Sequence, residues 1–167
     1  MLTYHPAFDS YHCAYRTLLL LTTLGRDNVE IDRMRIWDFY FVFPLETKNI
    51  SMTRDLWSFK GIPYEPNTYE ELVDPQRVFD RMKPFQLTAY KCLAACGLID
   101  SEELTEGRIK MSSKTIPTEL GQNMQSLDEP QEHAIKVIAG PLSSFPLSGP
   151  GGLKARTRLL DFKYDPS

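Results

Sequence analysis

Apolar residues recur at helical spacing in the first part of the chain. From Asp9 to Leu24 they cover one wide face, with four consecutive leucines at its centre. A helix that is apolar on so much of its circumference is normally buried on more than one side. Asp9 or Ser10 can cap its N-terminus with a side-chain oxygen, and Gly25 suits the left-handed residue that ends many helices. The pattern therefore predicts a buried helix.

A second predicted helix, from Val29 to Phe43, is the most aromatic stretch of the chain and stops at Pro44. Its charged residues lie mostly in the first half. The end of such a helix is either the centre of the core or a surface on which a partner docks. Large apolar residues are usually buried within their own domain, which favours the core. The residues that would form the alternative docking surface are Trp37, Phe39, Tyr40, Phe41 and Phe43.

The helical pattern weakens between residues 45 and 73. Gly61, Pro63 and Pro66 punctuate this stretch, which predicts a long connection with one short helix near 52–59. A connection of this length is unusual in a compact domain and often has a function. The aromatic side chains that could bind a partner here are Tyr64, Tyr69 and, as our interface candidate, Trp57.

The order of elements over residues 74–113 resembles a winged helix. An aspartate–proline pair at 74–75 marks a helix start, and Pro84 is predicted to end that helix. A second helix is expected over 85–96, followed by a hairpin formed by an extended apolar pair at 98–99, a polar turn, and a strand over 108–112 in which polar and apolar residues alternate. The chain is therefore predicted to be mainly α with a small β-hairpin, and to contain a winged-helix-like core.

The C-terminal part is predicted to consist of a helix, a linker and an arm. Asp128 or Glu129 starts the helix. Residues 141–152 are rich in Pro, Gly and Ser, which is typical of a linker or of a loop lying over the surface. We therefore expect a helical domain over 1–140, this linker, and an arm over 153–167. The arm residues that are candidates for a protein interface are Leu159, Phe162 and Tyr164.

Composition and charge are those of an ordinary globular protein. Hydrophobic residues make up 42% and charged residues 25%, which argues against disorder over the whole length. The formal net charge is −3, whereas a protein that mainly grips phosphates is usually basic. No apolar run approaches the roughly 20 residues needed to cross a bilayer, and no secretory signal is visible. Three cysteines without a disulfide spacing indicate reduced thiols in the cytoplasm.

Two groups of side chains are candidates for chemistry. Cys92 and Cys96 share a helix face and could surround zinc together with His12 and Cys13. Structural zinc sites usually use closely spaced pairs from turns, so small buried thiols are the favoured interpretation. His12 and Cys13 are adjacent on a helix, so their side chains point apart rather than forming a catalytic pair. No phosphate-binding glycine motif is present. We therefore expect no catalytic residue, no metal site and no cofactor.

Basic residues are poorly placed for reading DNA. The predicted recognition helix offers only Gln86 and Lys91 for base contacts, and the turn that follows is acidic at Glu102, Glu103 and Glu106. Phosphate would be repelled there, which favours protein contact for the winged-helix-like core. The residues that remain candidates for DNA contact are Lys91, Arg108, Lys110, Lys154, Arg156 and Arg158.

Three stretches carry a family resemblance: YHPAFD at 4–9, EIDRMRIWDFY at 30–40 and GLKART at 152–157. They resemble the middle component of bacterial three-component ABC-ATPase systems, a group that includes Lamassu-type anti-phage defence. The resemblance implies a small accessory subunit without catalytic residues. It also implies partners, namely an SMC- or Rad50-like ATPase that senses DNA and an effector, often a nuclease.

Three functions follow from these observations. The first is an adaptor that docks on an ATPase through the aromatic second helix, the long connection or the C-terminal arm. The second is a winged-helix regulator that binds DNA directly. The third, an enzyme that uses His12 and Cys13, is the least supported. The residues and the resemblance both favour the adaptor.

Overall fold

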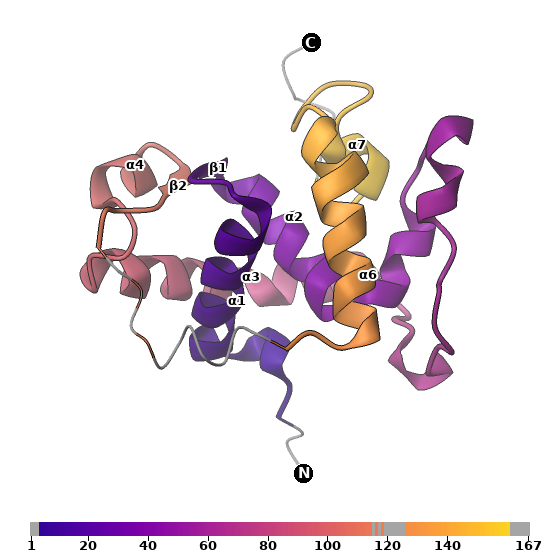
Figure 1. Ribbon diagram of the computed structural model, residues 1–167, viewed down its shortest axis with the longest axis horizontal. Coiled ribbons are helices and arrows are strands. Elements are labelled where there is room, and N and C mark those ends of the chain that lie inside the picture. The colour runs from indigo at the N-terminus through magenta and orange to yellow at the C-terminus, as the bar shows by residue number, and fades with distance from the viewer. Residues whose placement is uncertain (1–3, 115, 117, 119–125, 161–167) are drawn as a thin grey trace. The chain divides into compact units, whose positions relative to one another are not determined.

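The computed structural model describes residues 4–114, 116, 118 and 126–160, and these are mainly α-helical with one small antiparallel strand pair (Figure 1). This confirms the predicted fold class. The chain divides into two compact units. Unit 1 comprises Met1–Asp38 and Arg81–Leu127, and unit 2 comprises Phe39–Asp80 and Asp128–Ser167. The predicted domain over 1–140 with a separate arm stays a prediction.

Unit 1 begins with a 3-10 turn, η1 (Pro6–Phe8), and helix α1 (Ser10–Leu24). Asp9 caps α1, since its side chain accepts a hydrogen bond from the His12 backbone N–H. Gly25 ends the helix in the left-handed conformation, with φ of 61°. Both ends agree with the prediction because each is determined by a local signal in the sequence.

Strand β1 (Asn28–Glu30) precedes helix α2 (Ile31–Val42), where the sequence predicted continuous helix. β1 pairs in antiparallel fashion with β2 (Arg108–Lys110), and Val29 lies opposite Ile109. An isolated bridge joins Ile99 to Met111, as the predicted hairpin required. The partner strand β1 was missed because it is three residues long and pairs with residues about eighty positions away.

Helix α3 (Pro75–Ala95) runs through Pro84, so the predicted helix end at this residue is wrong. Proline removes the hydrogen bond to the Asp80 carbonyl. The cost is tolerable here because Pro84 and Asp80 are both exposed, and water can therefore solvate that carbonyl. Met82 and Gln86, on either side of Pro84, are buried and hold the helix together across the break. The predicted tight turn between two helices is therefore absent.

A short helix, α4 (Ser101–Thr105), occupies the turn between Ile99 and β2. The side chain of Asp100 caps it by accepting a hydrogen bond from the Glu103 backbone N–H. The sequence predicted a polar turn in this place. In Figure 1, α4, β1 and β2 lie side by side within unit 1.

The core of unit 1 contains a buried network of charged and polar side chains. The guanidinium of Arg16, on α1, binds the carboxylate of Asp38, on α2, through Nε and through Nη2, the latter at 3.2 Å. Gln86, on α3, donates to the same carboxylate at 3.0 Å and accepts from Arg35 Nε at 2.9 Å. All four residues are buried. The network therefore ties three helices together inside an otherwise apolar core.

Unit 2 consists mainly of short helical turns and helix α6. The turns are η2 (Pro44–Asn49), η3 (Arg54–Phe59) and η4 (Thr68–Glu70). Helix α6 (Glu129–Val137) begins at Asp128 in a capping box with Gln131, as the sequence predicted. It continues into a wider turn, η5 (Ile138–Leu142), and the described part of the chain closes with helix α7 (Leu153–Thr157).

The predicted linker over 141–152 begins in η5 and then folds back on the start of α7. Leu153 and Lys154 donate backbone hydrogen bonds to the carbonyls of Pro146 and Leu147, at 2.7 and 3.1 Å. A Cβ atom at Gly152 would lie 2.4 Å from the Ser148 carbonyl oxygen, so only glycine fits this loop. The alternative of a loop lying over the surface describes this segment better than an open linker.

Asp38→Ala should be strongly destabilising, because it leaves the Arg16 guanidinium buried without its counter-charge. We expect the free energy of unfolding, measured by urea titration, to fall by about 3–5 kcal/mol. Glu71→Gln is the matched control. It removes an ion pair with Lys48 in which both side chains are at least 40% exposed, and it should cost less than about 1 kcal/mol. Equal losses in the two variants would contradict the structural role of Asp38.

Candidate protein interface

Most of the aromatic candidates from the second helix lie in the core. Trp37, Phe39, Tyr40 and Phe41 are at most 4% exposed, and Phe43 is half-buried. The ring of Phe39 packs edge-on against Phe79, with centroids 5.9 Å apart. These residues therefore form part of the core, as the sequence favoured, and not an exposed docking surface. Leu159 is likewise buried, and Phe162 and Tyr164 lie outside the described residues.

Exposed large hydrophobic side chains instead gather on the long connection, residues 44–74. Trp57 is 55% exposed, Tyr69 is 96% exposed and Val73 is fully exposed. Tyr4 and Tyr11, near the N-terminus, are the other exposed large hydrophobic residues among those described. Trp57 is therefore the interface candidate that the structure places at the surface. Val73 was not identified from the sequence as an interface residue. The only feature of the sequence that indicates its exposure is that an apolar residue lies between acidic ones.

The connection is anchored at its base by a buried carboxylate. Glu46, in η2, is 2% exposed and accepts hydrogen bonds from the Leu72 backbone N–H and from the Asn49 side chain, both at 3.0 Å. Lys48 forms an ion pair with Glu71 beside it. These contacts bring the two ends of the connection together. A long segment is thereby held in place without regular secondary structure over most of its length.

Trp57 is exposed on a segment that is itself fixed. Its indole N–H donates to the Met52 carbonyl at 3.2 Å, and the Arg54 guanidinium lies 5.7 Å from its ring centre. Phe59, two residues on, packs against Gly140 in η5, where a Cβ would lie 3.0 Å from its ring. The Trp57 ring is therefore held in position while about half of its surface is accessible to a partner.

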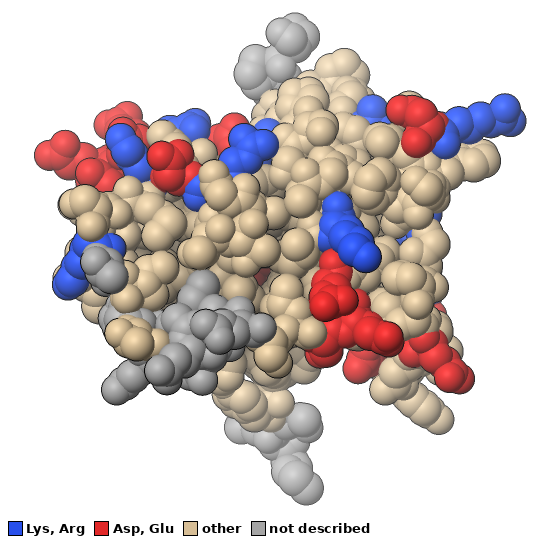
Figure 2. Space-filling model, viewed as in Figure 1, with Lys and Arg blue, Asp and Glu red and all other residues tan. Residues whose placement is uncertain are grey.

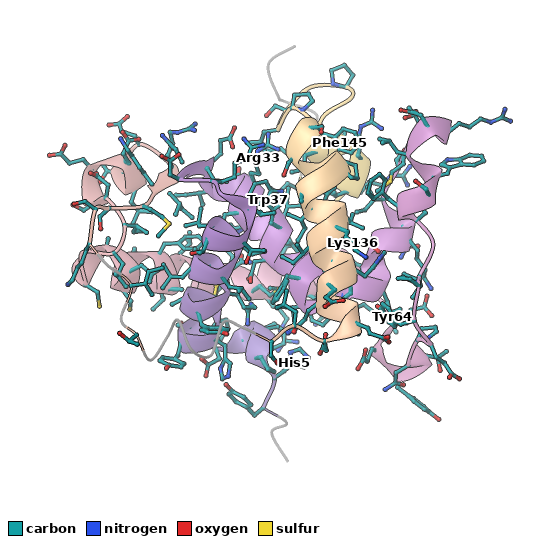
Figure 3. The ribbon with its side chains drawn as sticks, viewed as in Figure 1. His5, Arg33, Trp37, Tyr64, Lys136 and Phe145 are labelled. Carbon is teal, nitrogen blue, oxygen red and sulfur yellow. The ribbon has the colours of Figure 1, made fainter. Side chains whose placement is uncertain are left out.

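Tyr64, labelled in Figure 3, links the connection to α6 through a ring contact with His133. Their ring centroids are 6.0 Å apart, and His133 Nε2 lies 3.0 Å from Thr47 Oγ1. The Thr47 hydroxyl donates its hydrogen to the Pro44 carbonyl, so His133 Nε2 is the donor to Thr47. Burial, and then the nearby Lys136 ammonium, lowers the pKa of His133. His133 is therefore a neutral core residue that positions the connection.

The basic residues that are candidates for DNA contact are distributed over both units. They differ in whether their side chains are exposed or already bound within the chain. In unit 1, Lys91 and Lys110 are exposed, whereas Arg108 donates to the Asn28 side chain at 2.7 Å. Figure 2 shows carboxylates among the basic side chains where α4 and β2 lie. Exposed acids at Glu102 and Glu106 account for part of this mixture. This surface is therefore not a continuous basic patch of the kind that binds phosphates.

In unit 2, the Arg156 guanidinium makes several contacts within the chain. It donates to the Gly151 carbonyl at 2.7 Å and to the Ser51 carbonyl at 3.2 Å, and it lies 4.2 Å from the ring centre of Phe145. Arg156 thus supports the loop before α7 and is not available for DNA in this conformation. Of the other two candidates, Lys154 is half-buried and Arg158 is exposed.

The side chains of His12 and Cys13 point apart, as predicted: His12 belongs to a polar cluster at the N-terminus and Cys13 to the core. His12 is exposed, and its Nδ1 lies 2.7 Å from the Tyr4 hydroxyl, which donates to Asp9 at 2.8 Å. A hydrogen bond from the His12 backbone N–H is the main cause that lowers the pKa of Asp9 to about 2. Cys13 points inward, 3.6 Å from Asp38, and burial raises the pKa of its thiol. The two side chains therefore do not form a catalytic pair.

Cys92 and Cys96 are exposed, so the prediction that they are small buried thiols is wrong. They occupy the outer face of the last turn of α3, where the Cys96 backbone N–H donates to the Cys92 carbonyl at 2.9 Å. Helical spacing places them on one face but does not say which face is covered. Among the described residues no group of three or more potential ligands could hold a metal ion. In the same part of the chain, no helix has the length and apolar character needed to cross a bilayer.

Thiol labelling should separate the three cysteines. In the native protein, Cys92 and Cys96 should react readily with a chromogenic disulfide, because both are exposed, whereas Cys13 should react only after unfolding. Cys92→Ser should halve the number of thiols titrated in the native state. Rapid labelling of Cys13 in the native protein would contradict the closed core around Asp38.

Stability should depend on pH through His133. Its pKa in the folded protein lies below the ordinary value of 6.5, so the unfolded chain binds more protons as the pH falls. We expect the free energy of unfolding to decrease as the pH falls through the ordinary histidine pKa of 6.5, and this contribution should level out once the pH is below the lowered pKa of His133 in the folded protein. His133→Gln keeps a donor for Thr47 and should reduce this dependence. An unchanged pH profile in that variant would assign the dependence to other groups.

Comparison with known proteins identifies the family of the chain. A family model described as "ABC-three component (ABC-3C) system Middle Component 5" matches residues 2–165. No curated protein and no solved structure gives a match. The family match covers nearly the whole sequence, including both units and the anchored connection. The chain therefore belongs to the middle components of ABC-three component systems.

Proposed function

We propose that the protein is a non-catalytic adaptor that links the ATPase of an ABC-three component system to an effector. The observation that carries this proposal is the family match over residues 2–165. A middle component of a multi-component system has protein partners. The sequence resemblance adds finer expectations: an SMC- or Rad50-like ATPase that senses DNA, an effector such as a nuclease, and a Lamassu-type role in cytoplasmic anti-phage defence.

The anchored connection supports the adaptor role. Interface hot spots are enriched in tryptophan, tyrosine and arginine, and the connection exposes Trp57, which lies beside Arg54, and Tyr69. Because Glu46 and the Lys48–Glu71 pair hold the segment in place, little conformational entropy would be lost when a partner binds. We therefore assign the main protein interface to this connection.

The winged-helix interpretation belongs to the alternative function, a regulator that binds DNA. Two features are compatible with that fold. Along the chain the elements follow the order α1, β1, α2, α3, the bridge residue Ile99 and β2, and in the sheet β2 lies between β1 and Ile99. However, α2 and α3 are separated by the connection rather than by a tight turn, unlike a helix-turn-helix unit. The exposed carboxylates near Lys110 also favour a protein-binding role.

Co-expression with the proteins encoded beside it tests the adaptor proposal. We expect a tagged middle component to co-purify with a large ATPase in a fixed ratio, as measured by the mass of the eluted complex. Trp57→Ser should reduce the amount recovered, whereas Tyr11→Ser removes a more exposed aromatic residue of unit 1 and should not.

Two outcomes would overturn the proposal. A folded protein that elutes alone from the co-expression would exclude an adaptor that forms a stable complex. Retention of duplex DNA by the isolated protein, abolished by Lys91→Ala with Lys110→Ala, would instead support the DNA-binding regulator.

A further inference from the structure

The distal half of the connection holds a tyrosine almost wholly in solvent. Tyr69 lies in η4, whose first turn is closed by the Asn67 side chain, which accepts from the Tyr69 backbone N–H at 3.1 Å. The chain is fixed again at Leu72 by Glu46 and at Glu71 by Lys48. Tyr69 and Val73 are therefore exposed on a backbone that is held on both sides. The fold thus leaves Tyr69 96% exposed.

The segment that carries this exposed surface contains charged residues of one sign. From residue 61 to residue 74 the chain carries four carboxylates and no lysine or arginine. Glu71 is neutralised by Lys48, but Glu65, Glu70 and Asp74 are exposed. An exposed apolar surface bordered by carboxylates would repel DNA, RNA and anionic lipid headgroups. It is complementary to a positively charged protein surface.

Acidic residues of α6 extend the same charge around Tyr64. Burial, and then the carboxylates of Glu70 and Asp128, raises the pKa of the Tyr64 hydroxyl, so both carboxylates lie near that ring. The ring of Tyr64 also contacts His133 on α6, whose exposed first turn includes Glu129 and Glu132. Figure 2 shows a group of carboxylates on this side of the molecule, with a single basic group above it. Two segments of unit 2 therefore supply carboxylates to one surface.

We propose that the surface formed by Tyr69, Val73, Glu65 and Glu70 docks an arginine- or lysine-rich segment of a partner protein. The inference rests on the proposed adaptor function and names the chemistry of one partner. An exposed tyrosine ring can stack with a guanidinium, and the carboxylates beside it can accept its hydrogen bonds. Arginine suits both contacts, since its planar group stacks and donates at the same time.

A labelled peptide of alternating arginine and alanine provides a defined probe. Binding to the full-length protein is measured by fluorescence anisotropy at low salt. The double variant Glu65→Lys with Glu70→Lys should weaken binding by about tenfold. The control, Glu102→Lys with Glu106→Lys on the α4 turn, changes the formal net charge equally and should change binding by less than about twofold. Equal weakening by the two double variants, or no binding to the wild type, would overturn the proposal.

Tyr69 variants test the aromatic contribution separately. Tyr69→Phe keeps the ring and should bind the peptide as the wild type does, whereas Tyr69→Ala should bind several-fold more weakly. Because Tyr69 is 96% exposed, neither change should alter the thermal unfolding midpoint, which serves as the folding control. Equal binding of the peptide by the alanine and phenylalanine variants would show that the Tyr69 ring does not contribute to the proposed surface.

Co-expression distinguishes the failure of this inference from the failure of the adaptor proposal. If the wild type and the Glu65→Lys, Glu70→Lys variant recover the same partner proteins equally well, the docking surface is wrong and the adaptor function stands. If the wild type recovers no partner at all, the adaptor function fails, and the peptide measurement still decides whether the surface recognises basic segments. If the Glu65→Lys, Glu70→Lys variant loses a partner protein and the α4 control retains it, the result supports both the adaptor function and the docking surface.

Discussion

The ion pair between Arg16 and Asp38 is the interaction on which the arrangement of unit 1 depends. It is buried, and its carboxylate, on α2, binds side chains from α1 and α3. Charges in an apolar core are costly unless every hydrogen-bonding group finds a partner, so the pair constrains the positions of α1, α2 and α3 together. Gln86 donates a further hydrogen bond to the Asp38 carboxylate from the second half of α3, beyond Pro84. Continuity of α3 through that proline is therefore required by the network as well as by apolar packing.

Local signals in the sequence were sufficient for some parts of the fold and misleading for others. Asp9, Gly25 and Asp128 act on the turn in which they lie, and each marks a helix end as predicted. Pro84 is also a strong local signal, but buried residues on both sides of it outweigh the loss of one hydrogen bond. β1 has hardly any local signal, because its pairing partner lies in a distant part of the chain.

The proposed interface was harder to predict, because exposure is a property of the fold rather than of a residue. Trp37 and Trp57 are the same residue type in aromatic surroundings, yet one is 1% and the other 55% exposed. Helical periodicity placed Cys92 and Cys96 on one face but could not say that this face is outward. Likewise, the pairing of Arg16 with Asp38 joins residues with no recognisable spacing in the sequence. Such contacts between distant residues become apparent only when the helices are placed.

The connection combines two features that rarely occur together in a segment with so little regular structure. Its base holds a buried carboxylate, Glu46, whose hydrogen bonds close the segment, while its outer part exposes Trp57 and Tyr69. A mobile loop could expose the same side chains, but a partner would then have to bear the entropic cost of ordering them. Because that ordering is already achieved within the chain, even a small contact area can support specific binding. The carboxylates at the edge of the segment then restrict the choice of partner by charge rather than by added area.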